Sequence, residues 1–452
     1  MDINIFNSLS REIEKFEPIN NNSVSLYTCG PTVYNYPHIG NYRAYVFADM
    51  LKRFLQYRGY KIKHIMNITD VDDKTIRDSK INNKSLKDFT EFYTEEFFKD
   101  RDILNIIPPD KYTKATDYID EMVSMIEQLL EKGYAYRGDD GSIYFDIRKD
   151  KEYGKLSHFK LTDLKTNADG RMKKDEYDKE NTEDFALWKA WDENDGDVYW
   201  ETSLGKGRPG WHIECSAMSI AELSEQIDIH TGGVDLIFPH HENEIAQSEC
   251  STGKQFVKYW MHNEHLMVDS KKMSKSLGNF YTLRDLIDKN INPLAFRLWL
   301  YTAGYRTKTN FTLESIKASE VALKRLNDAF LDLSEYIDGS IDKEYKNKLI
   351  AYMSNDLDTP GALSLLWDLV HDTNISKADK RATMLDFDNI FGFGFDKLKN
   401  DIIPQNINEL VSERELAREN KDWAKSDELR SRINELGYEV KDTDNGPKIS
   451  KI

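Results

Sequence analysis

The chain has 452 residues, of which 31 % are charged and 39 % hydrophobic, and its formal net charge at pH 7 is −17. This length predicts about three domains with packed cores. Three cysteines exclude a disulfide-rich scaffold and favour a reducing compartment. Residues 1–10 carry no basic segment followed by an apolar one, and no run of 18 apolar residues follows, so we expect neither secretion nor membrane spanning but a cytoplasmic protein. The acidic balance by itself argues against a nucleic-acid partner.

The N-terminal part has the pattern of a parallel α/β sheet. Residues 23–28, SVSLYT, form an apolar run typical of a buried strand, which CGPT then breaks. A helix is predicted from Gly40 to a stop at Gly59, because apolar residues recur at a spacing of 3.6, at Val46, Phe47, Met50, Leu51, Phe54 and Leu55. Residues 61–68 predict the next strand and complete a right-handed βαβ unit. In a doubly wound sheet, ligands collect at the carboxyl ends of the strands, here residues 28–32 and 67–73.

Composition predicts the organisation of the remainder. Residues 145–200 are rich in charge and glycine and read as an insertion, after which the sheet pattern resumes at 211–218, 227–230, 256–261 and 265–268. Amphipathic segments, including 315–332 and 349–370, predict a helical bundle. Residues 410–436 predict a charged helix that ends at Gly437, followed by a small hairpin over 438–452. Residues 1–140 and 206–265 are predicted to form the two halves of a Rossmann-like domain, with the insertion at 141–205 between them. The segment that contains the sequence KMSKS follows at 266–320, the helical bundle at 321–403 and a separate C-terminal region at 404–452.

Two motifs predict a phosphate site when they are taken together. His38 and Asn41 of the sequence PHIGN fall in the first turn of the predicted helix, where backbone amides favour an anion, while Gly40 leaves room for a nucleotide. The lysines of KMSKS, Lys272 and Lys275, are three residues apart in a loop rich in serine and glycine and can surround a triphosphate. Taken singly, each motif is equally a capped turn or a solvated basic turn. Their occurrence in this order favours the phosphate interpretation.

A metal site is also plausible from the residue types. Cys29 ends a strand, Cys215 follows WHIE, and the run HHENE places a histidine and Glu244 on one helix face. Cysteine, histidine and glutamate are zinc ligands. Spacing does not choose between His240 and His241, and scattered cysteines are often not ligands.

The segments YTCGPTVYNYPHIGN, NITDVDDK, GRPGWHIECSAM, DIHTGGVDLIFPHHENEIAQS and KMSKSLGN resemble the class I aminoacyl-tRNA synthetases, and the cysteinyl-tRNA synthetases in particular. The resemblance extends over nearly the whole chain. It implies a catalytic Rossmann-like domain with an insertion, a helical bundle and a C-terminal anticodon-recognition region. It also implies ATP-dependent attachment of L-cysteine to tRNA(Cys) through cysteinyl-adenylate, with one zinc ion, magnesium accompanying ATP, and a monomeric enzyme. One departure is Asn41, where the class pattern has a histidine.

The resemblance implies roles for individual residues. The zinc ligands would be Cys29, Cys215, His240 and Glu244, whereas Cys250 has no counterpart in the family. Cysteine would be bound by Gly30, Thr69, Trp211 and His230. ATP would be bound by His38, Gly40, Asn41, Asp235, Lys272, Ser274 and Lys275, and the residues that act on the phosphates during the reaction would be His38, Asn41, Lys272 and Lys275. Read without the family, Thr69, Trp211 and His230 are equally packing or turn residues, and for Trp211 packing is the favoured interpretation. Asp235 is equally a helix cap.

Zinc gives such a site a physical means of selecting cysteine over serine. An apolar pocket discriminates near-isosteres by only about 1 to 3 kcal/mol. Zinc prefers a thiolate, whereas a hydroxyl stays neutral and is a weak ligand. A selectivity of roughly 10⁴, or about 5.5 kcal/mol, could follow without an editing domain.

Two other functions are consistent with parts of the sequence. A cysteine ligase that acts on an amino sugar would share the catalytic half, but such relatives lack the C-terminal region that this chain retains. A non-catalytic paralogue that binds zinc or tRNA is disfavoured by the intact lysine motif. The tail is a second departure, because it reads GPKI at 446–449 where the family usually has Gly-Thr-x-Trp, so that Ile449 replaces an aromatic residue able to stack on a base. Arg430, Arg432 and Lys448 are available there for phosphates.

Overall fold

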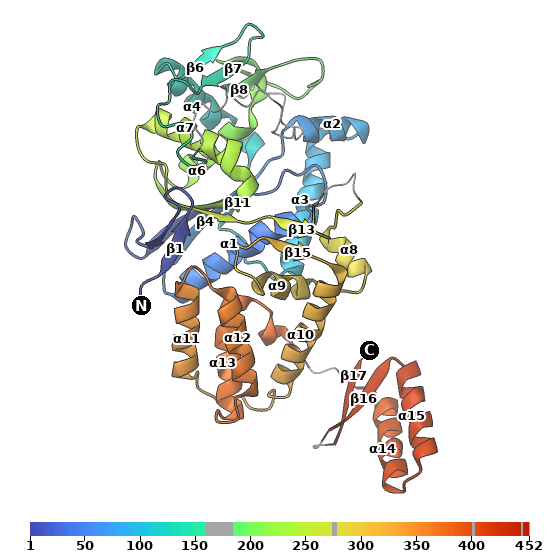
Figure 1. Ribbon diagram of the computed structural model, residues 1–452. Coiled ribbons are helices and arrows are strands. Elements are labelled where there is room, and N and C mark those ends of the chain that lie inside the picture. Colours follow the sequence, from blue (N-terminus) through green and yellow to red (C-terminus); the bar gives the residue numbers. More distant parts are fainter. Residues whose placement is uncertain (159–183, 274–277, 400–402, 444–445, 452) are drawn as a thin grey trace. The chain divides into compact units, whose positions relative to one another are not determined.

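The computed structural model describes residues 1–158, 184–273, 278–399, 403–443 and 446–451. The chain divides into two compact units, Met1–Phe395 and Asp396–Ile452 (Figure 1). The finer division into six segments stays a prediction.

The centre of the first unit is a parallel sheet with strand order β12-β11-β3-β4-β5. Its strands are β3 (Ser23–Thr28), β4 (Lys61–Ile68), β5 (Lys111–Lys114), β11 (Ile227–Gly233) and β12 (Val257–Asn263). The chain first builds outward from β3 through β4 to β5, and later returns to the other side of β3 with β11 and β12. The strand order therefore reverses between β3 and β11, which is where ligands bind in sheets of this kind. The doubly wound α/β fold predicted from the sequence is confirmed.

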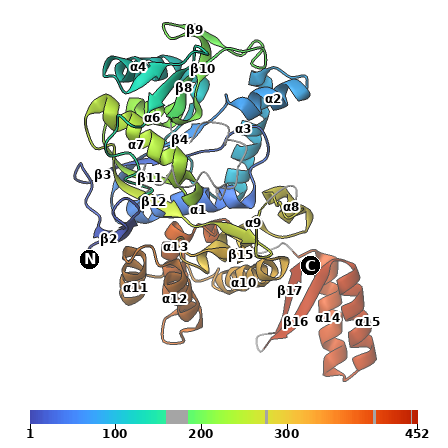
Figure 2. The ribbon, with the colours of Figure 1, turned by 45° about the horizontal axis from the view of Figure 1, so that its top comes forward.

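Helices cover both faces of this sheet. Figures 1 and 2 show α1 (Ile39–Tyr57) on one side, and α6 (Trp211–Glu222) with α7 (Glu242–Thr252) on the other. The other helices that precede the second half of the sheet are α2 (Asp73–Ile81), α3 (Leu86–Ile103), the short turn η1 (Ala115–Asp117) and α4 (Ile119–Glu131). The N-terminus adds a hairpin of β1 (Asn4–Asn7) and β2 (Glu12–Lys15).

Residues 211–218, expected to be part of the sheet, instead begin helix α6. The helix is buried all round over residues 212–219 because it packs against the parallel sheet and also against the inserted sheet. Its Ile213 shares a core with Phe145 and Trp188 of the insertion. A helix with no polar stripe cannot be distinguished from a buried strand by periodicity, and for this reason the prediction was wrong.

The insertion is an antiparallel sheet with strand order β6-β7-β8-β10-β9. Its strands are β6 (Ala135–Arg137), β7 (Ile143–Asp146), β8 (Asp184–Ala190), β9 (Trp200–Thr202) and β10 (Gly205–Pro209). Along the chain this sheet separates β3, β4 and β5 from β11 and β12, as expected for an insertion.

Residues 265–268 also differ from the expectation, because they leave the parallel sheet. Strand β13 (Leu266–Val268) pairs with β14 (Lys271–Lys272) and β15 (Thr309–Phe311) in a separate three-stranded sheet. Between β12 and β13, the backbone N–H of Glu264 donates to the Tyr305 carbonyl at 2.9 Å, so the chain already contacts the segment before β15 at this point.

A helical bundle follows, as predicted. Its elements are α8 (Leu283–Asp288), α9 (Pro293–Tyr301), α10 (Leu313–Leu331), α11 (Lys343–Ser354), α12 (Thr359–His371) and α13 (Lys377–Phe391), with a short turn η5 (Phe395–Lys397) after it. The amphipathic segment 349–370 is two helices rather than one. The chain breaks where Asp356 and Leu357 take positive φ values of 51° and 57°, and Asp358 then caps α12 by accepting the N–H of Gly361.

A buried ion network fixes α1 to this bundle. Asp49 of α1 accepts a hydrogen bond from Arg53 Nε at 2.8 Å and forms an ion pair with Arg297 of α9. The Arg297 guanidinium is fully buried and also donates to the carbonyls of Leu104 and Phe391, at 3.0 and 2.6 Å. These contacts join α1, the loop after α3, and helices α9 and α13. We call Asp49, Arg53 and Arg297 the buried ion network.

The second unit contains α14 (Gln405–Glu419), α15 (Trp423–Glu435) and a hairpin of β16 (Tyr438–Thr443) and β17 (Gly446–Lys451). The predicted hairpin and the stop at Gly437 are present, with φ of 84° at that glycine. The single helix expected over 410–436 is wrong. It breaks where Lys421 takes a φ of 57° and Asp422 caps α15.

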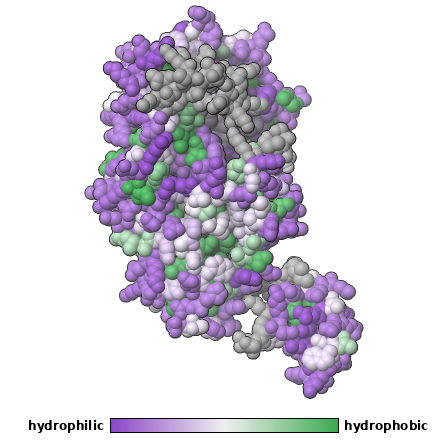
Figure 3. All heavy atoms as spheres, viewed as in Figure 1, coloured by the Kyte–Doolittle hydropathy of each residue, from purple (hydrophilic) through white to green (hydrophobic). Residues whose placement is uncertain are grey.

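The face of the molecule in Figure 3 is predominantly hydrophilic, with small scattered hydrophobic patches. Within the described ranges, none of the helices combines the length and the hydropathy that crossing a bilayer requires.

Candidate active site

A cavity of about 370 Å³ opens where the strand order of the parallel sheet reverses. Its walls are the loop after β3, the first turn of α1, the end of β11 with turn η2 (Val234–Leu236), and the link from β12 to β13. Lys74 of α2, Trp211 of α6, Met273 and Phe280 also contribute to the wall. The volume is typical of a small-molecule site. Residues 29–32 line the cavity, and they belong to the first of the two ligand positions predicted from the sequence, residues 28–32.

The first turn of α1 presents two of the predicted phosphate contacts. His38 caps the helix, and its Nδ1 accepts a hydrogen bond from the backbone N–H of Asn41 at 3.2 Å. In return, Asn41 Oδ1 accepts the backbone N–H of His38 at 3.0 Å. This capping box fixes both side chains at a helix N-terminus, where the helix dipole favours an anion. Both residues line the cavity, so capping and phosphate binding are compatible roles.

Gly40 lies between these residues and also lines the cavity. A Cβ atom at this position would be 2.9 Å from ring atoms of His38 and 3.5 Å from Met273 Cε. A larger residue would therefore displace the His38 ring. This is a second reason for glycine, beside the room for a nucleotide expected from the sequence.

The lysine motif is described only in part. Lys272 ends β14, whose backbone pairs with β13, and Met273 after it lines the cavity. Ser274 and Lys275 lie outside the described residues. The motif therefore begins at the cavity wall.

Asp235 lies in η2 and lines the cavity on the β11 side. A Cβ atom on Gly233 would be 2.4 Å from Asp235 Oδ1. The glycine thus lets the Asp235 carboxylate lie close to the end of strand β11.

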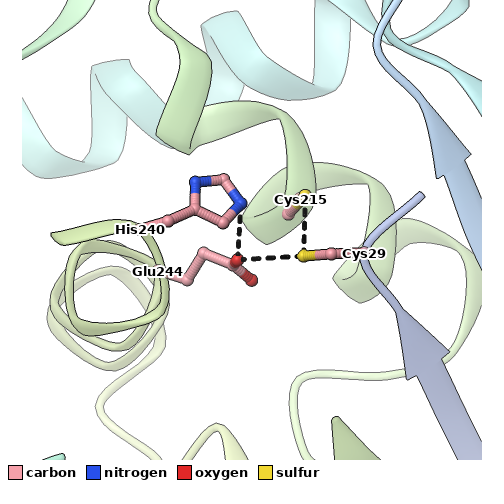
Figure 4. A group of neighbouring side chains, drawn as sticks. All are labelled: Cys29, Cys215, His240 and Glu244. Carbon is pink, nitrogen blue, oxygen red and sulfur yellow. Dashed lines mark hydrogen bonds and ion pairs between the residues drawn. The ribbon is translucent and has the colours of Figure 1, made fainter. Parts of the chain in front are cut away.

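Four potential metal ligands meet next to the cavity (Figure 4). Cys29 follows β3, Cys215 lies on α6, His240 lies in turn η3 (Ile237–His241), and Glu244 lies on α7. Their ligand atoms are all within 4.8 Å of one another, and all four residues are buried. The sulfurs are 3.8 Å apart, and Glu244 Oε1 is 3.0 Å from His240 Nε2. Two thiols, an imidazole and a carboxylate fit the donor set that zinc accepts.

The charges of this group also suit a cation. Although burial opposes ionisation, the hydrogen bond from Cys29 and the nearby His240 lower the pKa of the Cys215 thiol to about 6. Burial, and then Cys215, raise the pKa of Cys29. Burial opposes ionisation of Glu244 as well, but His230 and His240 lower its pKa to about 2. Burial opposes protonation of His240, but Glu244 and Cys215 raise its pKa to about 10, so this ring would release a proton when a metal binds, because all four ligands must be deprotonated.

The choice between His240 and His241, which spacing left open, depends on the neighbours of each ring. His241 Nε2 is 3.3 Å from Cys29 Sγ, and Cys29, His230, His241 and Glu244 form a second group within 4.8 Å. That group contains one thiol, whereas the group with His240 contains two. Because thiolates favour zinc, the donor chemistry favours His240.

Two of the residues predicted to bind cysteine lie at the cavity wall. Gly30 donates its N–H to Asn67 Oδ1 at 2.7 Å, and a Cβ atom on Gly30 would be 1.8 Å from the Asn67 carbonyl oxygen. Only glycine allows this close approach of the two backbones. Trp211 also lines the cavity and stacks on His240, with ring centroids 4.1 Å apart.

The other two predicted cysteine-binding residues are buried, and the described part of the cavity wall does not include them. Thr69 Oγ1 donates to Glu214 Oε2 at 2.7 Å. His230 Nε2 is 2.9 Å from Glu244 Oε2, and the His230 ring stacks on Trp260. His230 thus contacts Glu244 of the metal group directly, and Thr69 contacts Glu214, the residue before Cys215 in α6.

The sequence analysis missed several wall residues. The link from β12 to β13 contributes Asn263, Glu264, His265 and Leu266, and the loop before His38 contributes Tyr34 and Tyr36. The link could have been found, because it directly follows a predicted strand at the carboxyl edge of the sheet. The tyrosines carried no comparable signal.

Comparisons with known proteins agree with this geometry. A sequence profile described as "tRNA synthetases class I (C) catalytic domain" matches residues 15–321, and one described as "Cysteinyl-tRNA ligase anticodon binding domain" matches residues 401–447. The Cysteine--tRNA ligase of Brachyspira hyodysenteriae is 48 % identical and covers 99 % of both chains. That of Chlamydia felis is 47 % identical and covers 99 % of this chain and 98 % of its own.

Solved structures share the fold at low sequence identity. Mycobacterium tuberculosis methionyl-tRNA synthetase in complex with methionyl-adenylate is 13 % identical, with a TM-score of 0.56 over 82 % of this chain and 90 % of the other. LeuRS of Agrobacterium radiobacter K84 in a ternary complex is 10 % identical, with a TM-score of 0.59 over 85 % and 86 % of the two chains. With both sequence profiles and relatives matched over nearly its full length, the chain belongs to the cysteine--tRNA ligases, a family of class I aminoacyl-tRNA synthetases.

Proposed function

We propose that this chain attaches L-cysteine to tRNA(Cys) in two steps at one site. In the first, the cysteine carboxylate attacks the α-phosphorus of ATP, giving cysteinyl-adenylate and pyrophosphate. In the second, a ribose hydroxyl of the terminal tRNA adenosine attacks the mixed anhydride, and AMP leaves. One observation carries the proposal: Cys29 belongs both to the metal group and to the wall of the cavity at the β3/β11 switch point. A substrate in the cavity can therefore reach the metal group.

Cys29, Cys215, His240 and Glu244 would hold one zinc ion. When bound, zinc supplies a Lewis acid that prefers a thiolate to a hydroxyl and so separates cysteine from serine. The protein orients the substrate around it. Gly30 leaves room beside the backbone, and Trp211, which stacks on His240, forms an adjoining wall. We infer that Thr69 and His230 support this wall from behind.

The phosphates of ATP belong at the N-terminus of α1. Because His38 Nδ1 accepts the N–H of Asn41, the neutral ring carries its proton on Nε2, and we assign that donor to a phosphate oxygen. Asn41 uses Oδ1 in the capping box, so its Nδ2 is the group that donates to phosphate. Asp235 would bind the ribose hydroxyls from the β11 side.

No enzyme nucleophile is needed, so catalysis rests on positioning and on charge stabilisation. Lys272 and Lys275 would stabilise the triphosphate as negative charge moves to pyrophosphate, with Ser274 beside them. Magnesium would accompany ATP. We further infer that the C-terminal unit binds the anticodon of tRNA(Cys), and that the enzyme acts as a cytoplasmic monomer.

Two assays test this function. Cysteine-dependent exchange of pyrophosphate into ATP should occur with purified protein, and serine should support it at least about 10³-fold less well. Charging of total tRNA with cysteine should follow. If the protein catalyses pyrophosphate exchange but does not charge tRNA, the amino-sugar ligase is the better assignment. If it does not catalyse pyrophosphate exchange, the non-catalytic binding protein is the better assignment. X-ray absorption on the cysteine-bound protein should gain a sulfur neighbour at zinc, and an unchanged shell would refute the selection mechanism.

A further inference from the structure

Aromatic side chains form a continuous surface that extends outward from the cavity wall. Tyr36 lines the cavity, and its ring contacts Tyr93 and Phe92 of α3 with centroids 5.4 and 6.4 Å away. The Phe92 and Tyr93 rings are 5.1 Å apart, and buried Phe89 packs beneath Tyr93 at 5.1 Å. Phe92 is 40 % exposed. We call Tyr36, Phe92 and Tyr93 the aromatic surface.

Cations lie over the rings of this surface. The Arg284 guanidinium carbon is 4.0 Å from the Tyr36 ring centroid, and Lys84 Nζ is 5.1 Å from that of Phe92. Arg284 is held in place by ion pairs with Glu96 and Asp100 of α3. The surface therefore combines aromatic faces, a fixed guanidinium plane and an exposed ammonium group.

Two carboxylates of α3 near this surface are paired with lysines, whereas Asp88 and Glu95 of the same helix are exposed. Glu96 also pairs with Lys99 at 2.6 Å, and Glu91 lies 3.8 Å from Lys114. Bases themselves carry no charge, so a ligand that presents its base faces here gains stacking without bringing its phosphates onto these acids. Unpaired nucleotides, whose bases are free to stack on aromatic rings and on arginine, have this chemistry.

The geometry points to the aromatic surface as the binding site for the unpaired nucleotides at the 3′ end of tRNA. This inference rests on the proposed function, which requires the terminal adenosine to enter the cavity. Tyr36 connects the surface to that cavity, so a strand that stacks along Phe92 and Tyr93 is led toward the reacting atoms. Phe92 and Tyr93 thus order the last nucleotides for the second step, and neither residue is among the described residues of the cavity wall where the first step takes place.

Replacement of Phe92 by Ala tests the inference, because its ring is 40 % exposed and its removal leaves buried Phe89 in place beneath Tyr93. Loss of one base–aromatic stack should lower kcat/KM for tRNA charging by about 5- to 150-fold. Pyrophosphate exchange, which needs only cysteine and ATP, should stay within about twofold of wild type. Phe92→Trp should restore charging. The matched control is Tyr336→Ala, whose ring is 39 % exposed beneath Lys377 at 5.0 Å and lies on the bundle.

Binding of shortened tRNA identifies the occupant. Phe92→Ala should weaken binding of intact tRNA but leave binding of tRNA without its terminal unpaired nucleotides unchanged. An equal loss on both tRNAs would assign the surface to the duplex stem and overturn the inference, as would charging at the wild-type rate. If the wild-type protein catalyses neither pyrophosphate exchange nor tRNA charging, the proposed function itself is refuted.

Discussion

Arg43 offers the sharpest test of how the two halves of the site are held together. This residue of α1 is 4 % exposed, and its guanidinium donates to the His265 carbonyl and Thr309 Oγ1, each at 2.7 Å, and to the Tyr305 carbonyl at 3.1 Å. A fourth bond reaches the Thr307 carbonyl. All four acceptors are neutral. Burial lowers the pKa of Arg43 to about 10, so the group is still charged at neutral pH.

The expected cost of Arg43→Met follows from these four bonds. Each buried acceptor that loses its donor destabilises the folded state by about 1 kcal/mol or more. The loss of all four hydrogen bonds therefore lowers the stability of the native arrangement by about 4 kcal/mol. Because His265 lines the cavity on the β12–β13 link, we expect part of this loss to appear in the use of ATP. A share of about 3 kcal/mol would lower kcat/KM for ATP by roughly 150-fold in pyrophosphate exchange.

The design of the Arg43 experiment separates local positioning from stability. Arg43→Lys keeps a charge but not the fork of donors, so it should fall between wild type and Arg43→Met. Arg58→Met makes the same change at the C-terminal end of α1, where the guanidinium donates to Ser354 Oγ and the Met1 carbonyl. That control should leave kcat/KM for ATP unchanged. If Arg43→Met folds and uses ATP at the wild-type level, the positioning argument is refuted.

Three further predictions concern the metal, the lysine motif and the buried ion network. Cys29→Ser and Cys215→Ser each remove a thiolate ligand, so each should lower the amount of bound zinc at least about tenfold. Bound zinc is measured by atomic absorption after dialysis. The control Cys250→Ser should bind as much zinc as the wild-type protein. Lys275→Ala should slow pyrophosphate exchange by about 10² or more with little change in cysteine affinity from calorimetry; wild-type exchange would contradict its role. Although burial opposes ionisation, the two arginines of the buried ion network lower the pKa of Asp49, so its contribution to stability is fully present above about pH 4 and is lost as pH falls through the lowered pKa. Asp49→Asn should therefore cost about 3 to 5 kcal/mol near pH 7 and show a flatter acid unfolding profile by circular dichroism, and an unchanged profile would exclude this linkage.

The sequence predicted the first βαβ unit well because its elements have one buried face or a short apolar run between clear breaks. It failed at α6, where burial on all sides removes the polar stripe that marks a helix. It also failed at Lys421, because a single residue of positive φ divides a charged helical pattern without a glycine or proline to mark the break. Local patterns record exposure and turn or capping residues. At α6 the exposure signal is absent, whereas at Lys421 the capping residue Asp422 is present but lies within a continuous charged helical pattern.

The site shows the same limit. Residue types predicted the metal group, and the structure brings all four members together, but spacing could not separate His240 from His241. His240 and His241 are adjacent in η3, and both approach Cys29. The choice between them therefore depends on Cys215, which lies on helix α6. Arg43 was invisible for a related reason. Three of its four acceptors are backbone carbonyls, and no side-chain pattern records which carbonyls a fold brings to one guanidinium.

The net charge of −17 is compatible with a tRNA partner because it is an average over unlike regions. Residues 261–310 around the lysine motif contain eight Lys+Arg and four Asp+Glu, and 8 − 4 gives +4. Some of the acids are also internal. Asp228 accepts the N–H groups of Ile19 and Ser25, and buried Glu242 accepts that of Ser157. These carboxylates hold backbone in place and do not face a ligand. The remaining surface acids repel polyanions in general, so we expect nucleic acid to bind at the basic and aromatic surfaces beside the cavity and at the C-terminal unit.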